Sequence, residues 1–439
     1  MKHTKNTLLT TLMLTYLSTL PIYAQEDNNV TQSKDMIVIP FGFSSEGTGF
    51  AGGVGVIKQG LLQPQTTLVA SAMYGAEQDI ITNGENDTAN FAAAFISFSN
   101  YQLPFTERVF FSLIGLKSFI PKSTYTLKNA NDKEPNVPFV SSGKNDFFNT
   151  TFKYVLPLGE GLDNPRGMYD LRNGFAQGRE GYGNGTPFVT GRTSLSLKTF
   201  YQSTSYENWG DLSQFLEGTR TSTPEWNTNG LRLHLEHDNT DYDLNPSRGY
   251  NFVVQYSKDF GANEAFQSWD FLEFKYNKYY NLDTFSFTQQ NVLALSFWTG
   301  HSFSWDNENT TVSGLDAHRT PIWEGARLGG FNRMRGYTSN RFSDKSVIYG
   351  TAEYRTVLDY NPLRKNEFLP VAVDWFQVVA FVEAGQVNDE YNLDLFSEMK
   401  YDVGISLRAF AAQLPVRIDF AYGDEGGSMW VMIQQPFDF

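Results

Sequence analysis

The sequence contains no cysteine. Neither a disulfide framework nor a lipid-anchored cysteine is therefore available, so backbone pairing and packing must hold the fold together. After residue 24, no run approaches the roughly 18 consecutive apolar residues that a helical membrane span requires. Positive charge is also scarce, because 34 Lys and Arg stand against 48 Asp and Glu, and the net charge of −14 argues against a nucleic-acid partner.

Signals for catalysis and metal binding are missing as well. The sequence has no Gly-x-Ser-x-Gly elbow and only five histidines. His234 and His237 are three residues apart, so on a strand they face opposite sides and cannot share a metal. The acidic run 238–243 lacks the Gly and the Glu of a calcium loop and is typical of a solvated turn. We therefore expect no enzymatic activity, no cofactor and no bound metal.

The chain begins with an export signal. Lys2 and Lys5 precede an apolar run over 8–20 that threonines interrupt, and Pro21-Ile22-Tyr23-Ala24 follows it. This order predicts a signal peptide over residues 1–24.

Composition favours a membrane barrel for the rest of the chain. Aromatic residues make up 15% of the sequence, with 37 Phe and 23 Tyr, and there are also 37 Gly. Together with export and the absence of Cys, this composition fits an outer-membrane β-barrel better than a soluble periplasmic domain. We expect a short periplasmic segment over 25–35 and the barrel over 36–439.

Hydrophobic periodicity supports strands at the C-terminal end. Between 401 and 410, and again between 414 and 424, apolar and polar residues alternate, so each segment has one oily face and one wet face. A soluble sandwich could show the same pattern. The last residues favour a barrel, because Phe437 and Phe439 continue the apolar parity of a final strand over 428–438. A terminal aromatic on such a strand resembles the signal that outer-membrane barrels present to their assembly machinery.

The whole pattern predicts about sixteen antiparallel strands. They are expected at 36–44, 49–60, 64–75, 88–99, 106–119, 145–157, 187–206, 225–238, 248–260, 266–281, 284–299, 346–359, 373–387, 399–411, 414–424 and 428–438. With both termini in the periplasm, the connections 76–87, 120–144, 207–224 and 300–345 lie outside, and the short ones lie inside. The Gly-rich segment 158–186 is an exception, because parity places it inside, where the other connections are short.

Four motifs in order resemble one family of barrels. In chain order they are Asp238-Asn239 followed by Asn245 to Tyr250, then Met334-Arg335-Gly336-Tyr337, Glu353-Tyr354-Arg355 and Phe381-Val382-Glu383-Ala384-Gly385. Over roughly 225–439 the chain is similar to the outer-membrane protein assembly factor and two-partner-secretion transporter superfamily, also called bacterial surface antigens, although Glu383 replaces the usual Asp. The resemblance implies a barrel whose long outer loop folds into the lumen.

The residues themselves are consistent with such a docked loop. Strand parity turns Glu353, Arg355, Glu383 and Gly385 toward the lumen, and Arg335 is the cation that can dock between the two carboxylates. The alternative is that Arg-Gly-Tyr forms an ordinary turn of an outer loop. Four further charges are expected to line the same wall: Asp402, Arg408, Arg417 and Asp419.

The resemblance implies a function in the bacterial outer membrane. We expect translocation or insertion of a protein or lipid client, with outer-membrane lipid and the assembly machinery for the barrel itself as partners. Family members usually carry periplasmic domains ahead of the barrel, and only about a dozen residues follow Gln25 before the first expected strand. Client capture would then need a separate periplasmic partner or a different mode of recognition. A diffusion channel for small solutes and a structural or adhesive surface barrel remain as alternatives.

Overall fold

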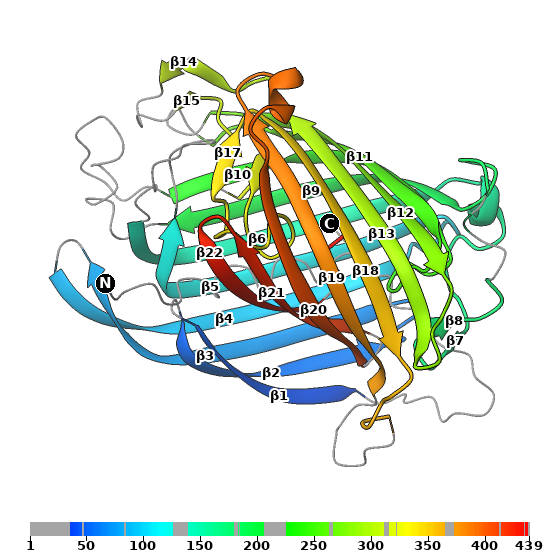
Figure 1. The fold of residues 1–439 in the computed structure, drawn as a ribbon. Coiled ribbons are helices and arrows are strands. Elements are labelled where there is room, and N and C mark those ends of the chain that lie inside the picture. The colour runs from blue at the N-terminus through cyan, green and yellow to red at the C-terminus, as the bar shows by residue number, and fades with distance from the viewer. Residues whose placement is uncertain are drawn as a thin grey trace.

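The fold is one large antiparallel sheet that curls into a barrel (Figure 1). We analysed a computed structural model, which describes residues 36–45, 48–82, 85–125, 139–179, 183, 185–205, 225–262, 267–310, 316–321, 323–364, 373–411, 414–433 and 435–437. The expected signal peptide and the segment 25–35 lie outside the described residues. Among the described residues, no helix is both long and apolar enough to cross a membrane.

The sheet has sixteen strands, each hydrogen-bonded to the next along the chain. Their bounds are β1 Ile37–Ser45, β2 Gly49–Gln59, β3 Thr67–Thr82, β4 Glu85–Gln102, β5 Val109–Tyr125, β6 Phe139–Val155, β9 Arg192–Ser205, β10 Glu225–Thr240, β11 Gly249–Asp259, β12 Asp270–Leu282, β13 Thr288–His301, β18 Ser346–Leu358, β19 Val373–Asn388, β20 Lys400–Ala411, β21 Leu414–Gly423 and β22 Gly426–Ile433. The expected strand number and antiparallel order are confirmed.

Short elements fill the long connections. Three pairs of small strands form local hairpins, and two single 3-10 turns complete the set. The bounds are β7 Leu171–Arg172, β8 Phe175–Ala176, β14 Asp306–Thr310, β15 Asp316–Ala317, β16 Ala326–Leu328, β17 Phe342–Asp344, η1 Gly159–Leu162 and η2 Leu393–Phe396.

The two ends of the barrel carry different connections. We call the end where β1 begins the inner end and the opposite end the outer end. In Figure 1 the labels β14, β15 and β17 lie at the outer end, and β7 and β8 lie at the inner end. The loop 302–345 therefore starts and finishes at the outer end, and the segment 158–186 lies at the inner end, as parity predicted.

Alternation along the strands separates a lumen face from an outward face. On β20, Tyr401 is 57% exposed and Val403 is 55% exposed, whereas Asp402 between them is 2% exposed. On β21, Phe420 points outward and Asp419 is fully buried. The outward apolar side chains are those a lipid bilayer would cover, and the polar ones fill the lumen.

Several expected boundaries were wrong. The residues 76–87 are not an outer loop, because β3 continues to Thr82 and β4 starts at Glu85. The expected loop 120–144 is likewise shortened from both sides by β5 and β6. The composition of these strand ends is polar, and polar residues can pair in a ladder that extends beyond the apolar band.

The end of the chain corrects the prediction most clearly. The last strand, β22, ends at Ile433, and it does not continue to 438. Phe437 is 2% exposed and packs in the lumen against Tyr279, and its carbonyl accepts a hydrogen bond from Lys275 Nζ. Phe439 lies outside the described residues. Parity along the chain failed here because a turn at 436–437 breaks the strand.

Candidate functional site

The loop between β13 and β18 enters the lumen and ends in a tight buried turn. The short strands β16 and β17 pair with each other and form the stem. At the tip, Met334 adopts a positive φ of 54°, and the Tyr337 N–H donates to the Met334 carbonyl at 3.0 Å. Met334 and Arg335 are both 0% exposed, and Tyr337 is 2% exposed. The structure therefore encloses the whole Met-Arg-Gly-Tyr motif.

Arg335 lies between two carboxylates of the lumen wall. Its Nε is 3.1 Å from Glu383 on β19, and its Nη2 is 2.9 Å from Glu353 on β18. The guanidinium also stacks over the Phe381 ring at 3.4 Å. Burial opposes the charge on Arg335, but Glu383 and Glu353 outweigh that effect and raise the pKa of the guanidinium. The side chain is therefore held by charge, hydrogen bonds and an aromatic face together.

The backbone of the turn is fixed as firmly as its side chain. The Arg335 N–H donates to Glu383, and the Gly336 N–H donates to Asp402 on β20 at 3.0 Å. On β22, Trp430 Nε1 donates to the Arg335 carbonyl at 2.8 Å, and the Ser428 hydroxyl donates to the same oxygen. These bonds tie the tip of the loop to strands β19, β20 and β22.

Two glycines make this close approach possible. A Cβ added at Gly336 would lie 2.6 Å from the Cβ of Asp402, closer than real Cβ contacts come. A Cβ at Gly423 would lie 2.8 Å from the ring of Tyr337, so the ring can lie flat on β21 only because Gly423 has no side chain. The Tyr337 hydroxyl then reaches the Tyr401 carbonyl at 3.1 Å.

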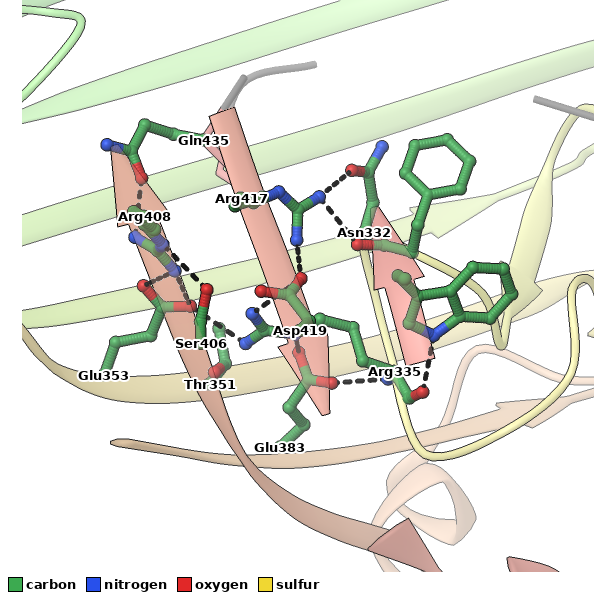
Figure 2. Close-up of polar contacts among 12 residues, drawn as sticks. Asn332, Arg335, Thr351, Glu353, Glu383, Ser406, Arg408, Arg417, Asp419 and Gln435 are labelled. Carbon is green, nitrogen blue, oxygen red and sulfur yellow. Dashed lines mark hydrogen bonds and ion pairs between the residues drawn. The ribbon is translucent and has the colours of Figure 1, made fainter. Parts of the chain in front are cut away.

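Glu353 is the centre of a larger ion network. Besides Arg335, its carboxylate receives Arg355 Nε at 2.8 Å and Arg408 Nη2 at 2.9 Å. Arg408 also donates to Gln435, which follows the last strand. In Figure 2, Arg408 lies between Glu353 and Gln435. The three arginines come from the loop, β18 and β20, so the curvature of the sheet and the docking of the loop together bring them to one carboxylate.

A second ion pair extends the network along β21. Arg417 pairs with Asp419, and its Nη2 donates to the Phe331 carbonyl of the loop at 2.8 Å. Arg335 Nη1 is 3.6 Å from Asp419 (Figure 2). The network thus contains four guanidinium groups and four carboxyl groups, all at most 2% exposed: Arg335, Arg355, Arg408, Arg417, Glu353, Glu383, Asp402 and Asp419. Glu353, Glu383 and Asp419 pair with guanidinium groups, whereas Asp402 binds the Gly336 N–H of the turn.

Burial makes the network sensitive to the loss of any single member. Removing one member of a desolvated ion pair leaves an unpaired buried charge and costs roughly 3–5 kcal/mol. The four charges that the sequence suggested as general lining of the lumen therefore lie in the network that holds the loop. Gly385 also contributes, because a Cβ there would lie 2.8 Å from Leu328 of β16.

Sequence reasoning missed several residues that hold the loop. Phe381 and Tyr349 complete the pocket around Arg335 and Glu383, and Trp430, Ser428 and Gln435 contact the loop or the network from the last strand and the residues after it. One signal was present in the sequence, since Trp430 occupies the wet parity of the final strand. A bulky aromatic on a lumen face needs a partner to cover it.

The other residues considered as sites have structural roles. His234 faces the lumen beside Lys198 and Gln255, whereas the ring of His237 packs against Phe252. Asp241 accepts hydrogen bonds from the backbone N–H groups of Ser247 and Arg248 and fixes the turn between β10 and β11. Within the described ranges, no group of three or more His, Asp or Glu side chains could hold a metal ion.

Comparison with protein families gives one clear match. The Omp85 superfamily domain matches residues 125–439, which include the docked loop and all of the wall that binds it. No curated protein matches the chain.

Among the solved structures that the chain is similar to, one supports the fold. CdiB from Escherichia coli has a TM-score of 0.52 and 10% identity, and the match covers 90% of this chain and 61% of that one. CdiB from Acinetobacter baumannii has a TM-score of 0.49 and 11% identity, over 89% of this chain and 57% of the other. BamA from Haemophilus ducreyi, in a form lacking POTRA domains 1-3, has a TM-score of 0.47 and 11% identity, with 91% and 68% covered. The chain thus spans less than two thirds of either CdiB.

Proposed function

Because the chain belongs to the Omp85 superfamily, whose members are outer-membrane transporters and assembly factors, we propose that it translocates or inserts a protein or lipid client. The barrel lies in the bacterial outer membrane. In this proposal, the docked Met334–Tyr337 turn controls the translocation or insertion of the client. It holds the C-terminal wall in place until a client displaces it.

The bonds from the loop to the last strands carry this proposal. Trp430 and Ser428 of β22 both donate to the Arg335 carbonyl, so undocking the turn also frees the last strand. Within the described residues, the sheet order begins at β1 and ends at β22, and no ladder pairs these two strands. A strand that is paired on one side and held by a loop on the other can be released sideways. We expect a client to pass through this seam.

The proposal includes partners. The barrel needs outer-membrane lipid around its apolar face and the assembly machinery for its own insertion. A separate periplasmic protein would bring the client to the inner end. The aromatic and apolar side chains that point outward from β20 and β21 supply the lipid contact.

Conductance of the refolded barrel in planar bilayers tests whether the loop fills the lumen. We expect the intact protein to show only small, flickering openings, because the loop occupies the lumen beside β18–β22. Deletion of residues 305–340 should enlarge them. Large and steady openings of the intact protein would instead favour a solute channel and contradict the proposal.

A point variant ties conductance to client handling. Gly336→Leu should undock the turn, because a Cβ there would lie 2.6 Å from the Cβ of Asp402. Gly427→Leu is the matched control, because a Cβ there would lie 3.5 Å from its nearest neighbour, an atom of the Tyr422 ring.

In proteoliposomes, the wild-type barrel should speed the insertion of a urea-denatured eight-stranded outer-membrane protein, and a fluorescent phospholipid should be followed in parallel. If neither probe moves faster than in empty liposomes, the transport function is wrong for both client classes.

A further inference from the structure

The segment between β6 and β9 crosses the inner end of the barrel, and neither the docked loop nor the ion network includes it. We name residues 159–179 the inner clasp. It contains η1 and the β7–β8 hairpin, and Figure 1 shows this hairpin at the end of the barrel opposite to β14 and β15. The clasp belongs to a connection far longer than an inner turn needs, because neighbouring strands can be joined by a few residues.

The tip of the clasp lies on an aromatic pair of the wall. Trp375 of β19 and Phe410 of β20 stack with ring centroids 5.0 Å apart, and both are 0% exposed. Gly174, with a φ of 75°, sits on this pair, and Trp375 Nε1 donates to its carbonyl at 3.3 Å. A Cβ at Gly174 would lie 2.7 Å from Trp375 Nε1 and 2.8 Å from Phe410. The contact therefore depends on glycine at the tip.

The clasp joins the parts of the wall on the two sides of the seam. Leu171, Tyr169 and Phe175 belong to one apolar cluster with residues from both sides. One side consists of Ile37 and Ile39 of β1, Ile57 of β2 and Val69 of β3, and the other consists of Val357 of β18, Trp375 and Phe410. β1 and β20 lie near the two ends of the sheet order, so the cluster bridges the unpaired seam at its inner end.

A buried ion pair fixes the far end of the clasp. Arg179 binds Glu160 through two hydrogen bonds of 2.9 and 3.1 Å, and both side chains are at most 9% exposed. The same guanidinium donates to the carbonyls of Thr240 and Asp241 in the β10–β11 turn and stacks over Tyr169. The clasp is therefore closed on itself and attached to a third part of the rim.

From these contacts we propose that residues 159–179 are a gate that closes the inner end of the lumen and holds the β1–β3 wall against the β18–β20 wall. Lumen-facing residues beneath it become accessible from the inner side only when the hairpin lifts off Trp375 and Phe410. The gate is separate from the Arg335 loop, and its operation does not depend on the identity of any client.

Thiol labelling tests the gate directly, because the chain has no native cysteine. Val357→Cys puts a thiol at a position that is 0% exposed under the clasp. In the otherwise unchanged barrel, a charged methanethiosulfonate reagent should react slowly. Adding Gly174→Leu should speed the reaction about tenfold or more, because overpacking a closed contact shifts its opening equilibrium by that order.

A glycine elsewhere in the clasp supplies the matched control. Gly178 also has a positive φ, of 67°, but a Cβ there would meet nothing within 4 Å. Gly178→Leu carries the same backbone strain without the clash, so its labelling rate should stay close to that of the parent. Equal acceleration by both variants, or fast labelling of the parent, would overturn the gate. Equal slow labelling by both folded variants would overturn it too.

A second pair of variants guards against misfolding. Arg179→Gln removes the bonds to Glu160 and should also raise the labelling rate, whereas Arg172→Gln changes an exposed arginine of the β7–β8 hairpin and should not. Heat-modifiable migration of the barrel in electrophoresis reports folding of each variant. No client enters the assay, so failure of the transport function leaves its result unchanged.

Discussion

Arg335 combines contacts that a lysine in its place could not make together. Its guanidinium reaches Glu383 and Glu353 in two directions while its flat face covers Phe381. A lysine ammonium is a compact charge without a planar fork or an extended face, so it could satisfy one carboxylate at most in this geometry. The site therefore requires arginine for its shape as well as for its charge.

Replacing Arg335 by methionine tests this requirement. Arg335→Met keeps much of the side-chain volume but leaves buried carboxylates with one cation fewer, so we expect a loss of roughly 3–5 kcal/mol in the free energy of unfolding. Urea unfolding of the barrel in lipid vesicles measures it. Arg341→Met is the control in the same loop, because its partner Glu425 is 41% exposed, and a loss of about 1 kcal/mol or less is expected there. Equal losses would contradict a special role of Arg335.

Asp344 at the end of β17 should make the loop stem sensitive to pH. Burial raises the pKa of Asp344 to about 6, and nearby Asp389 adds to the rise. The folded state then binds a proton more tightly than the unfolded state, whose Asp has a pKa near about 3.9. The contribution of Asp344 to stability is therefore highest below about pH 3.9 and falls as the pH rises to about 6.

Hydrogen exchange at the amides of β16 measures this effect. Protection should decrease between about pH 4 and pH 6 in the wild type, and Asp344→Asn should lose that part of the decrease. The difference between the two proteins isolates Asp344 from other titrating groups. A wild type and a variant with the same pH dependence would show that the stem does not respond to this carboxyl.

At the scale of elements, the residues after β22 behave as part of the lumen. Gln435 receives a hydrogen bond from Arg408, and Phe437 lies 4.6 Å from the Arg355 guanidinium and packs on Tyr279. The network around Glu353 thus continues into the chain end. The aromatic that the sequence suggested as an assembly signal has a structural contact of its own.

Truncating Phe437 separates these two roles. Phe437→Ala should lower the unfolding free energy by roughly 3–5 kcal/mol after refolding without any assembly machinery, because a buried ring is lost. Phe420→Ala, on the outward face of β21 at 41% exposure, should cost less. If Phe437→Ala refolds with full stability yet fails to insert in cells, then the ring serves recognition and not packing.

At the scale of the whole molecule, the sheet is asymmetric around its circumference. Strands β18 to β22 are joined to each other, to the docked loop and to the chain end, whereas β1 pairs only with β2 among the described residues. The apolar cluster of the inner clasp supplies the remaining link between the two sides. Stability should therefore be lowest at the seam.

Hydrogen exchange across the whole barrel in lipid nanodiscs tests this asymmetry. Amides of β1 and β22 should exchange faster than those of β18 and β19, because every second amide of an edge strand has no ladder partner. Strands β11 and β12 serve as an internal reference for a fully paired wall. Protection of β1 and β22 equal to that reference would mean that the two strands form a closed ladder.

The sequence by itself determined the parts of this protein that depend on local period. Alternation of apolar and polar residues predicted sixteen antiparallel strands, the inner or outer place of each connection, and the lumen direction of Glu353 and Glu383, because side chains alternate on any strand. Tertiary structure decided the rest. Arg335 and Arg408 meet at Glu353, the inner clasp rests on Trp375, and Phe437 turns inward, and each of these contacts joins residues of different elements. Their geometry follows from the curvature of the whole sheet and the inward path of the loops, which no local pattern encodes.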